Sequence, residues 1–139
     1  MKNIASSLTR LIYSSRPIAF DQEKVKDILR TARECNERDR ITGALICRDD
    51  IYLQLLEGAA QAVDRTYRRI VEDPRHNSIT LLLYERVAER MFPDWTMRND
   101  PIRLWMWSPS EVAAGDVERA PKRDLLKAFE RISAEQTGN

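Results

Sequence analysis

The chain has 139 residues, which fits one domain with its own hydrophobic core and leaves room for an appended element. Its 23 basic and 22 acidic residues nearly balance, and no basic cluster is interleaved with aromatic residues, so we expect no direct nucleic-acid binding. One His and two well-separated Cys argue against a zinc site, and we expect no metal. No apolar run resembles a membrane span or a signal peptide, so we expect a cytoplasmic protein that does not bind membranes.

The first half of the chain alternates between strand and helix patterns. A strand is predicted over residues 8–14, before a turn at Ser15-Arg16-Pro17. A second strand is predicted over residues 41–47, and a tight turn leads into a third strand over residues 51–58. Between the first two strands, Asp21 can cap a helix that ends near residues 36–39 and whose apolar residues recur on one face: Val25, Ile28, Leu29, Ala32 and Cys35.

The second half continues the alternation. A helix with Val63, Tyr67, Ile70 and Val71 on one face is broken by Asp73-Pro74-Arg75-His76, where His76 is interpreted as a turn residue. A fourth strand over residues 79–84 is apolar on both faces, and residues 92–97 suggest a turn into a short fifth strand with no defined pairing partner. The order βαββαβ plus one strand is the ferredoxin-like pattern of the α+β class. It places the first and third strands side by side, with both helices on one face of the sheet.

The C-terminal part is also predicted to be helical. Ser108-Pro109-Ser110-Glu111 is a capping box, Gly115 ends that short helix, and Pro121 opens a longer one. The longer helix carries one apolar stripe: Leu125, Leu126, Phe129 and Ile132. We expect the C-terminal helices to cover the second face of the sheet, with a partner chain as the alternative cover for four leucines: Leu53, Leu55, Leu81 and Leu83. The predicted organisation is therefore a domain over residues 1–100 and a helical cap over residues 101–139.

One polar residue interrupts the third strand, which is otherwise apolar on both faces. In this strand Gln54 shares a face with Tyr52 and Leu56. A buried primary amide without partners costs on the order of 1–3 kcal/mol. Its partner could be a backbone carbonyl, an ordered water or the polar edge of a heterocyclic ligand. Tyr13, on the first strand, could be the neighbour of Gln54 on the helix-covered face.

Several short motifs occur together in one order. They are Leu11-Ile12-Tyr13-Ser14-Ser15, Asn36 followed by Ile41-Thr42-Gly43-Ala44-Leu45, Gln54 within Leu53 to Gly58, Asp73-Pro74-Arg75-His76, and Trp95-Thr96-Met97 after Phe92-Pro93. Each motif alone is weak, but the ordered set resembles the BLUF domain, a blue-light sensor that uses FAD. The resemblance covers roughly residues 8–100.

The resemblance implies a FAD held between the two helices, with its isoalloxazine ring directed at the sheet. It assigns six residues to the cofactor: Asn36 and Gln54 at the polar edge of the ring, Ile28 and Ile70 on its two faces, and Arg69 with Asp73 at the helix end. Taken singly, Asn36 would be a helix C-cap residue, and Arg69 with Asp73 an ordinary surface pair. The residue before Asn36 is Asn or His in several members of the family, whereas here it is Cys35.

The resemblance also implies a photoactive network of four residues: Tyr13, Gln54, Trp95 and Met97. A tyrosine phenol can give an electron and a proton to an excited flavin, and a glutamine amide can relay that proton because it carries both a donor and an acceptor. The changed hydrogen bond would be passed to the strand that holds Trp95 and Met97. Whether Gln54 rotates or tautomerises, and which of Trp95 and Met97 lies nearer to it, stays open.

The resemblance further implies a photoreceptor and not an enzyme. The residues after position 100 are too few for a cyclase, phosphodiesterase or DNA-binding domain, so we expect signalling in trans to an effector protein, for which a phosphodiesterase and a transcriptional regulator are candidates. A homodimer or higher oligomer could form through the sheet face or the C-terminal helices. The alternatives are a colourless ferredoxin-like dimerisation or regulatory module and, less favoured, an acylphosphatase-like enzyme. Against the enzyme, Ser14-Ser15-Arg16-Pro17 offers no Gly-rich phosphate cradle.

Overall fold

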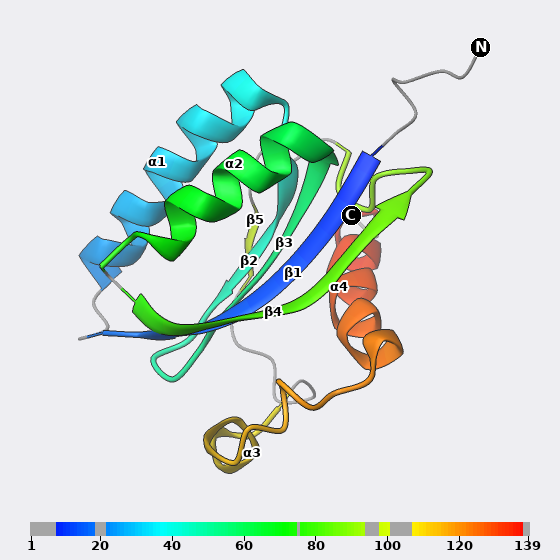
Figure 1. Ribbon diagram of the computed structural model, residues 1–139. Coiled ribbons are helices and arrows are strands. Elements are labelled where there is room, and N and C mark those ends of the chain that lie inside the picture. The colour runs from blue at the N-terminus through cyan, green and yellow to red at the C-terminus, as the bar shows by residue number, and fades with distance from the viewer. Residues whose placement is uncertain (1–7, 19–21, 75, 94–97, 101–106, 138–139) are drawn as a thin grey trace.

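The computed structural model describes residues 8–18, 22–74, 76–93, 98–100 and 107–137. These residues form the elements β1 (Leu8–Pro17), α1 (Gln22–Asp39), β2 (Thr42–Cys47), β3 (Tyr52–Ala59), α2 (Ala60–Val71), β4 (His76–Val87), β5 (Arg98–Asp100), α3 (Pro109–Ala113) and α4 (Lys122–Thr137). The strands form one sheet in the order β4-β1-β3-β2-β5, in which only the β2–β5 pair is parallel. The predicted ferredoxin-like α+β fold is confirmed, and β1 and β3 are the central pair (Figure 1).

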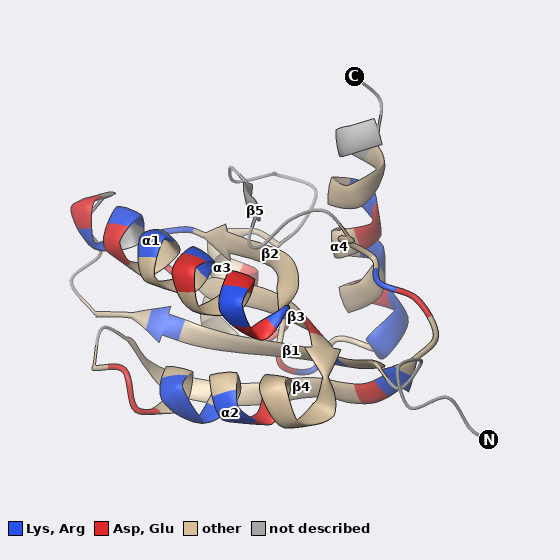
Figure 2. Cartoon of the chain, turned by 90° about the horizontal axis from the view of Figure 1, so that it is seen from above, with Lys and Arg blue, Asp and Glu red and all other residues tan. Residues whose placement is uncertain are grey.

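The two faces of the sheet are covered by different helices (Figure 1). Helices α1 and α2 cover one face, where Leu29 and Val63 pack with strand residues such as Leu56. Helix α4 covers the other face through the predicted stripe, since Leu125, Phe129 and Ile132 are buried with residues that include Leu53, Leu55 and Leu83. Figure 2 shows charges of both signs on the helices, whereas the central strands are mostly uncharged.

The predicted capping box at the start of α3 is present. The Ser108 side chain accepts a hydrogen bond from the Glu111 N–H at 3.1 Å, and the Glu111 carboxylate accepts one from the Ser108 N–H at 2.8 Å. Gly115 follows this helix with φ +83°, which favours glycine. None of the helices in the described parts of the chain is long and apolar enough to cross a bilayer.

The predicted turn at Ser15-Arg16-Pro17 is wrong, because β1 continues through these residues. Ser15 pairs with Tyr52 of β3, and Pro17 pairs with His76 of β4. Proline lacks an N–H but is tolerated here because it is the last residue of the strand. The extended pairing also makes His76 the first residue of β4 and not a turn residue.

Two apolar residues predicted to be buried are exposed. Leu81 is 47% exposed because β4 is an edge strand and its pairing with β1 shifts by one residue between Ile12 and Tyr13. This β-bulge breaks the alternation on which the prediction of two buried faces for β4 rested. Val71 is also exposed, since it lies eight residues after Val63 and is therefore displaced from it around the α2 axis.

The predicted fifth strand is present in the part of the chain that the structure describes. It covers Arg98–Asp100 and pairs in parallel with β2, with Ala44 opposite Arg98. This pairing answers the question of the fifth strand's partner, which the sequence pattern left open. Trp95 and Met97 belong to residues 94–97, outside the described residues.

A close backbone approach between β2 and β3 requires glycine at position 43. A Cβ atom there would lie 1.8 Å from the Leu55 carbonyl oxygen, so a side chain would force the two strands apart. We expect Gly43→Ala to lower the free energy of unfolding by about 3 kcal/mol, as measured by chemical denaturation. Gly58→Ala is the matched control, because its Cβ would meet the flexible end of Ile41 at 2.9 Å. Equal losses in the two variants would contradict the steric argument.

Candidate functional site

A pocket with a volume of about 550 Å³ lies between α1 and α2, above the central strands. Its size is in the range of small-molecule and cofactor sites. Its lining includes every predicted site residue that the structure describes: Tyr13, Ile28, Asn36, Gln54, Arg69, Ile70 and Asp73. Residues far apart in the sequence are therefore brought to one cavity. Trp95 and Met97, the other two predicted site residues, lie outside the described residues.

Tyr13 and Gln54 form the floor of this pocket. They are directly opposite each other in the register of β1 and β3, and the Tyr13 hydroxyl donates a hydrogen bond to Gln54 Oε1. Both side chains are buried. Burial, and to a smaller extent the nearby Cys47 and Asp73, raise the pKa of the Tyr13 phenol well above its ordinary value, so the phenol keeps its proton near neutral pH. The Gln54 amide therefore has a protonated phenol, which can donate a hydrogen bond, as its neighbour.

Asn36 is not the C-cap residue of α1. The helix runs on to Asp39, and the residue in left-handed conformation after it is Arg40, with φ +59°. Asn36 is only 1% exposed and lies in the pocket wall, while its backbone carbonyl accepts a hydrogen bond from the Ile41 N–H at 2.8 Å. A capping role thus does not account for a buried amide side chain at this position.

Arg69 reaches across to α1. Its Nη1 lies 3.8 Å from Asp39 Oδ2, and Arg65 Nη2 lies 4.0 Å from Asp39 Oδ1. The i, i+4 spacing predicted Asp73 as the partner of Arg69, and both residues do line the pocket. The contact with Asp39 joins the ends of the two helices, and sequence spacing could not predict it because residues 39 and 69 meet only in the folded chain.

Sequence reasoning missed Thr66, one turn before Ile70 on α2. The residue is 4% exposed and belongs to the pocket wall, and its hydroxyl oxygen is buried without a hydrogen-bond partner among the described residues. Such an unsatisfied group costs on the order of 1–3 kcal/mol. A ligand with polar atoms, seated in the pocket, would relieve that cost. No sequence signal marks this residue, since a threonine in a helix is usually exposed.

His76 was also missed, although the Asp-Pro-Arg-His motif contains it. Its Nε2 donates to the Ile70 carbonyl oxygen at 2.8 Å, and its Nδ1 lies 2.6 Å from Ser15 Oγ. The ring meets Tyr13 edge to face, with 6.3 Å between the ring centroids. His76 therefore connects α2, β1 and β4 beside the photoactive pair predicted from the sequence.

The donor set and shape of the pocket fit a flavin ring. Ile28 and Ile70 stand on opposite helices, where they could pack on two faces of a flat ring, and the amides of Asn36 and Gln54 offer groups for its polar edge. The unsatisfied Thr66 hydroxyl adds a further polar group. In the described ranges, no group of three or more His, Cys, Asp or Glu residues could hold a metal ion.

Comparison with known families decides the assignment. A sequence model of the BLUF family, whose members are sensors of blue light using FAD, matches residues 8–98. The chain belongs to the BLUF family.

Relatives of this BLUF protein include larger light-regulated proteins. It is 34% identical over 95 residues to the photoactivated adenylate cyclase subunit beta of Euglena gracilis, and 35% identical over 99 residues to the blue light- and temperature-regulated antirepressor BluF of Escherichia coli K12. These matches cover 68% and 70% of this chain but only 11% and 24% of the two relatives. The chain therefore spans a minor part of the curated relatives it matches.

A solved structure of similar extent is that of BlrB, a BLUF protein in its dark state. The two chains share 31% sequence identity with a TM-score of 0.77, and the match covers 94% of this chain and 98% of BlrB. As a BLUF protein, this chain is a blue-light sensor, and FAD is the chromophore of its family. The half-buried Cys35 lines the pocket next to Asn36, so the predicted departure lies in the wall of the candidate site.

Proposed function

We propose that this BLUF protein senses blue light through the Tyr13–Gln54 hydrogen bond and passes the signal in trans to an effector protein. The observation that supports this proposal is the hydrogen bond from the Tyr13 phenol to Gln54 Oε1 at the floor of a cofactor-sized pocket. Asn36 and Gln54 would bind the polar edge of the flavin ring, Ile28 and Ile70 its faces, and Arg69 with Asp73 the open end of the pocket.

A FAD held in this pocket would supply the absorption of blue light and an electron acceptor in its excited state. Tyr13 can supply that electron together with its phenolic proton, whose position in the dark is fixed by Gln54 Oε1. A primary amide carries a hydrogen-bond donor and a hydrogen-bond acceptor. Gln54 can therefore offer a donor where it offered an acceptor before, once the phenolic proton has moved. Tyr13 would recover its electron and proton, so the lasting change would be a rearranged hydrogen bond at Gln54 and no new covalent bond. Trp95 and Met97 complete the proposed network by resemblance.

An absorption spectrum tests the proposal most directly. Purified protein should be yellow, and blue light should shift its flavin absorption slightly to the red, with recovery in the dark. A protein that stays colourless after incubation with FAD would favour the alternative, a ferredoxin-like dimerisation or regulatory module. Flavin binding without a light-induced shift would contradict the proposed role of the Tyr13–Gln54 pair while leaving the cofactor site intact.

Thr66 provides a further test of the cofactor site. We expect Thr66→Val to weaken FAD binding about fivefold in a fluorescence titration, because valine keeps the shape but removes the unsatisfied hydroxyl. Thr66→Ser keeps the hydroxyl and should bind FAD as the unchanged protein does. Equal affinity in all three proteins would show that this hydroxyl does not bind the cofactor.

The output is proposed from the organisation of the chain and its relatives. Residues 1–100 would form the sensor and residues 101–139 a helical cap that presents the signalling surface, with β5 beside it. One relative is an antirepressor and another a photoactivated cyclase subunit, which supports an effector protein as the partner. A transcriptional regulator or a phosphodiesterase would suit this role, and self-association through the sheet face or the C-terminal helices would provide a second route. No enzymatic activity is proposed for residues 1–139.

A further inference from the structure

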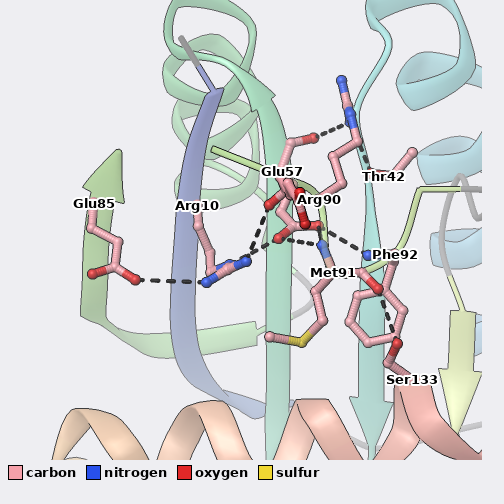
Figure 3. Close-up of polar contacts among 9 residues, drawn as sticks. Arg10, Thr42, Glu57, Glu85, Arg90, Met91, Phe92 and Ser133 are labelled. Carbon is pink, nitrogen blue, oxygen red and sulfur yellow. Dashed lines mark hydrogen bonds and ion pairs between the residues drawn. The ribbon is translucent and has the colours of Figure 1, made fainter. Parts of the chain in front are cut away.

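The carboxylate of Glu57 is the centre of a polar network on the sheet face opposite the pocket (Figure 3). Glu57 is 0% exposed and belongs to β3. Its Oε2 accepts a hydrogen bond from Arg10 Nε at 2.8 Å, and its Oε1 accepts from the Met91 N–H at 2.8 Å and the Phe92 N–H at 3.2 Å. One side chain therefore fixes the backbone of the segment that follows β4.

The surroundings of Glu57 are specific for a carboxylate. The three groups that contact its side-chain oxygens are all donors: the Arg10 guanidinium and the backbone amides of Met91 and Phe92. A carboxylate has two accepting oxygens, whereas a glutamine amide would turn an N–H toward one of these donors. Charge-assisted bonds of this kind are about twice as strong as neutral ones. Replacing Glu57 by Gln therefore preserves the shape but weakens the anchor, because it removes the charge and one of the two accepting oxygens.

The segment held by Glu57 is also the segment on which α4 docks. The Met91 carbonyl oxygen accepts a hydrogen bond from Ser133 Oγ at 3.0 Å, and the Phe92 ring meets Phe129 edge to face with 6.5 Å between centroids. Phe92 is fully buried between the sheet and α4. Met91 and Phe92 thus connect β3 to the C-terminal part of α4. On the β3 side, the connection is made by the Glu57 side chain.

Gln54 and Glu57 lie on the same central strand but project from opposite faces. Gln54 lines the pocket, and Glu57 follows it by three residues on the α4 side, an odd number that places the two side chains on opposite faces. Because both side chains belong to one strand, a shift of the β3 backbone at Gln54 would also move the Glu57 carboxylate. We propose that Glu57 is a positioning residue that couples the Gln54 strand to the docking of α4. This inference rests on the proposed photoreceptor function, and it names the residues through which a change at Gln54 would reach α4.

A second polar link from the sheet to α4 is weaker. Glu85 on β4 lies 3.7 Å from Arg10 Nη1 and 2.9 Å from the Nζ of Lys122, in the first turn of α4. Lys122 is largely exposed, and exposed ion pairs contribute little to stability. Glu85 therefore provides a matched control: Glu85→Gln removes the same charge from the same Arg10 network but leaves the Met91 and Phe92 amides bound.

The Glu57→Gln variant is expected to fold. Arg90, beside the anchored segment, donates to the Glu57 backbone carbonyl at 2.9 Å and to Thr42 Oγ1 at 2.8 Å, and the substitution leaves both acceptors in place. Ser133→Ala provides a second variant, which removes the hydrogen bond between α4 and the Met91 carbonyl oxygen and does not alter the sheet. The pair of variants tests the same route from both sides.

Hydrogen-exchange mass spectrometry of the FAD-loaded protein, in darkness and under blue light, tests the coupling. In the unchanged protein, illumination should increase exchange in α4. In Glu57→Gln the flavin red shift should remain, the Met91 and Phe92 amides should exchange about tenfold faster in the dark, and α4 should show the same exchange in both conditions. Ser133→Ala should reduce the light-dependent difference in α4, and Glu85→Gln should keep it.

The outcomes separate this inference from the proposed function. Absence of a red shift in the unchanged protein would contradict the photoreceptor mechanism itself. A normal red shift with an unchanged light-dependent difference in α4 of Glu57→Gln would overturn the coupling role of Glu57, as would a red shift without any α4 response in the unchanged protein. If Glu57→Gln fails to fold, a full α4 response in Ser133→Ala would overturn the route through Met91.

Discussion

Gln54→Leu is expected to bind FAD and to lose the light-induced red shift completely. Leucine fills nearly the same space in the buried row of β3, but it offers no acceptor to the Tyr13 hydroxyl and no group that can change its hydrogen bonding. FAD binding should persist, because the pocket keeps Asn36 and the two isoleucines. Difference spectra recorded before and after blue illumination, together with the flavin content of the purified variant, measure both quantities.

Gln61→Leu is the matched control for this substitution. Gln61 lies exposed in the first turn of α2 and is absent from the pocket lining, so the same chemical change there should leave the shift intact. A full red shift in Gln54→Leu would remove Gln54 from the mechanism. Loss of the shift in Gln61→Leu as well would point to a general disturbance of the fold.

Tyr13→Phe is expected to abolish the shift while flavin binding is retained. The phenylalanine ring keeps the packing against Tyr67 and His76, whose ring centroids lie 5.8 Å and 6.3 Å from that of Tyr13. It lacks the hydroxyl that donates to Gln54, and therefore the proton that the mechanism moves. The flavin excited state should also live longer, since its electron donor is lost. Time-resolved fluorescence and the light-minus-dark spectrum check these two outcomes.

Tyr67→Phe separates the Tyr13 hydroxyl from its aromatic surroundings. Tyr67 packs on Tyr13 from α2 and does not line the pocket. Tyr67→Phe therefore removes a phenol hydroxyl from the ring next to Tyr13 and leaves the Tyr13 hydroxyl in place. This variant should show a normal photocycle. An unchanged photocycle in Tyr13→Phe would exclude Tyr13 as the source of the electron and proton.

The sequence predicted the order of elements and the two-sided core correctly because both depend on local periodicity. The stripe of Leu125, Phe129 and Ile132, for example, is visible from residue spacing alone, and it is buried against the sheet as expected. The exposure of Leu81 was not predictable in the same way. It depends on a register shift between β1 and β4, which arises from pairing across more than sixty residues of intervening chain.

The candidate site shows the same division. The resemblance to the BLUF motifs located Tyr13, Asn36 and Gln54, and the structure brings all three to one pocket. Thr66 escaped notice because its significance lies in a buried hydroxyl that no described residue hydrogen-bonds, which is a property of the folded pocket. The contact of Asp39 with Arg69 likewise depends on how the two helices lie against each other. Trp95 and Met97 stay predictions.

The alternation of side chains along β3 has a consequence for how this kind of sensor diversifies. Tyr52, Gln54 and Leu56 lie on the sheet face that α1 and α2 cover, whereas Leu53, Leu55 and Glu57 lie on the face that α4 covers. Substitutions on the cap side can therefore accumulate without altering a pocket-lining residue of this strand. In evolution, one light-sensing face of the sheet can in this way be combined with different partners on the other face. A chimera that exchanges only α4 and the residues of β3 that face it would retain the colour and photocycle of its parent.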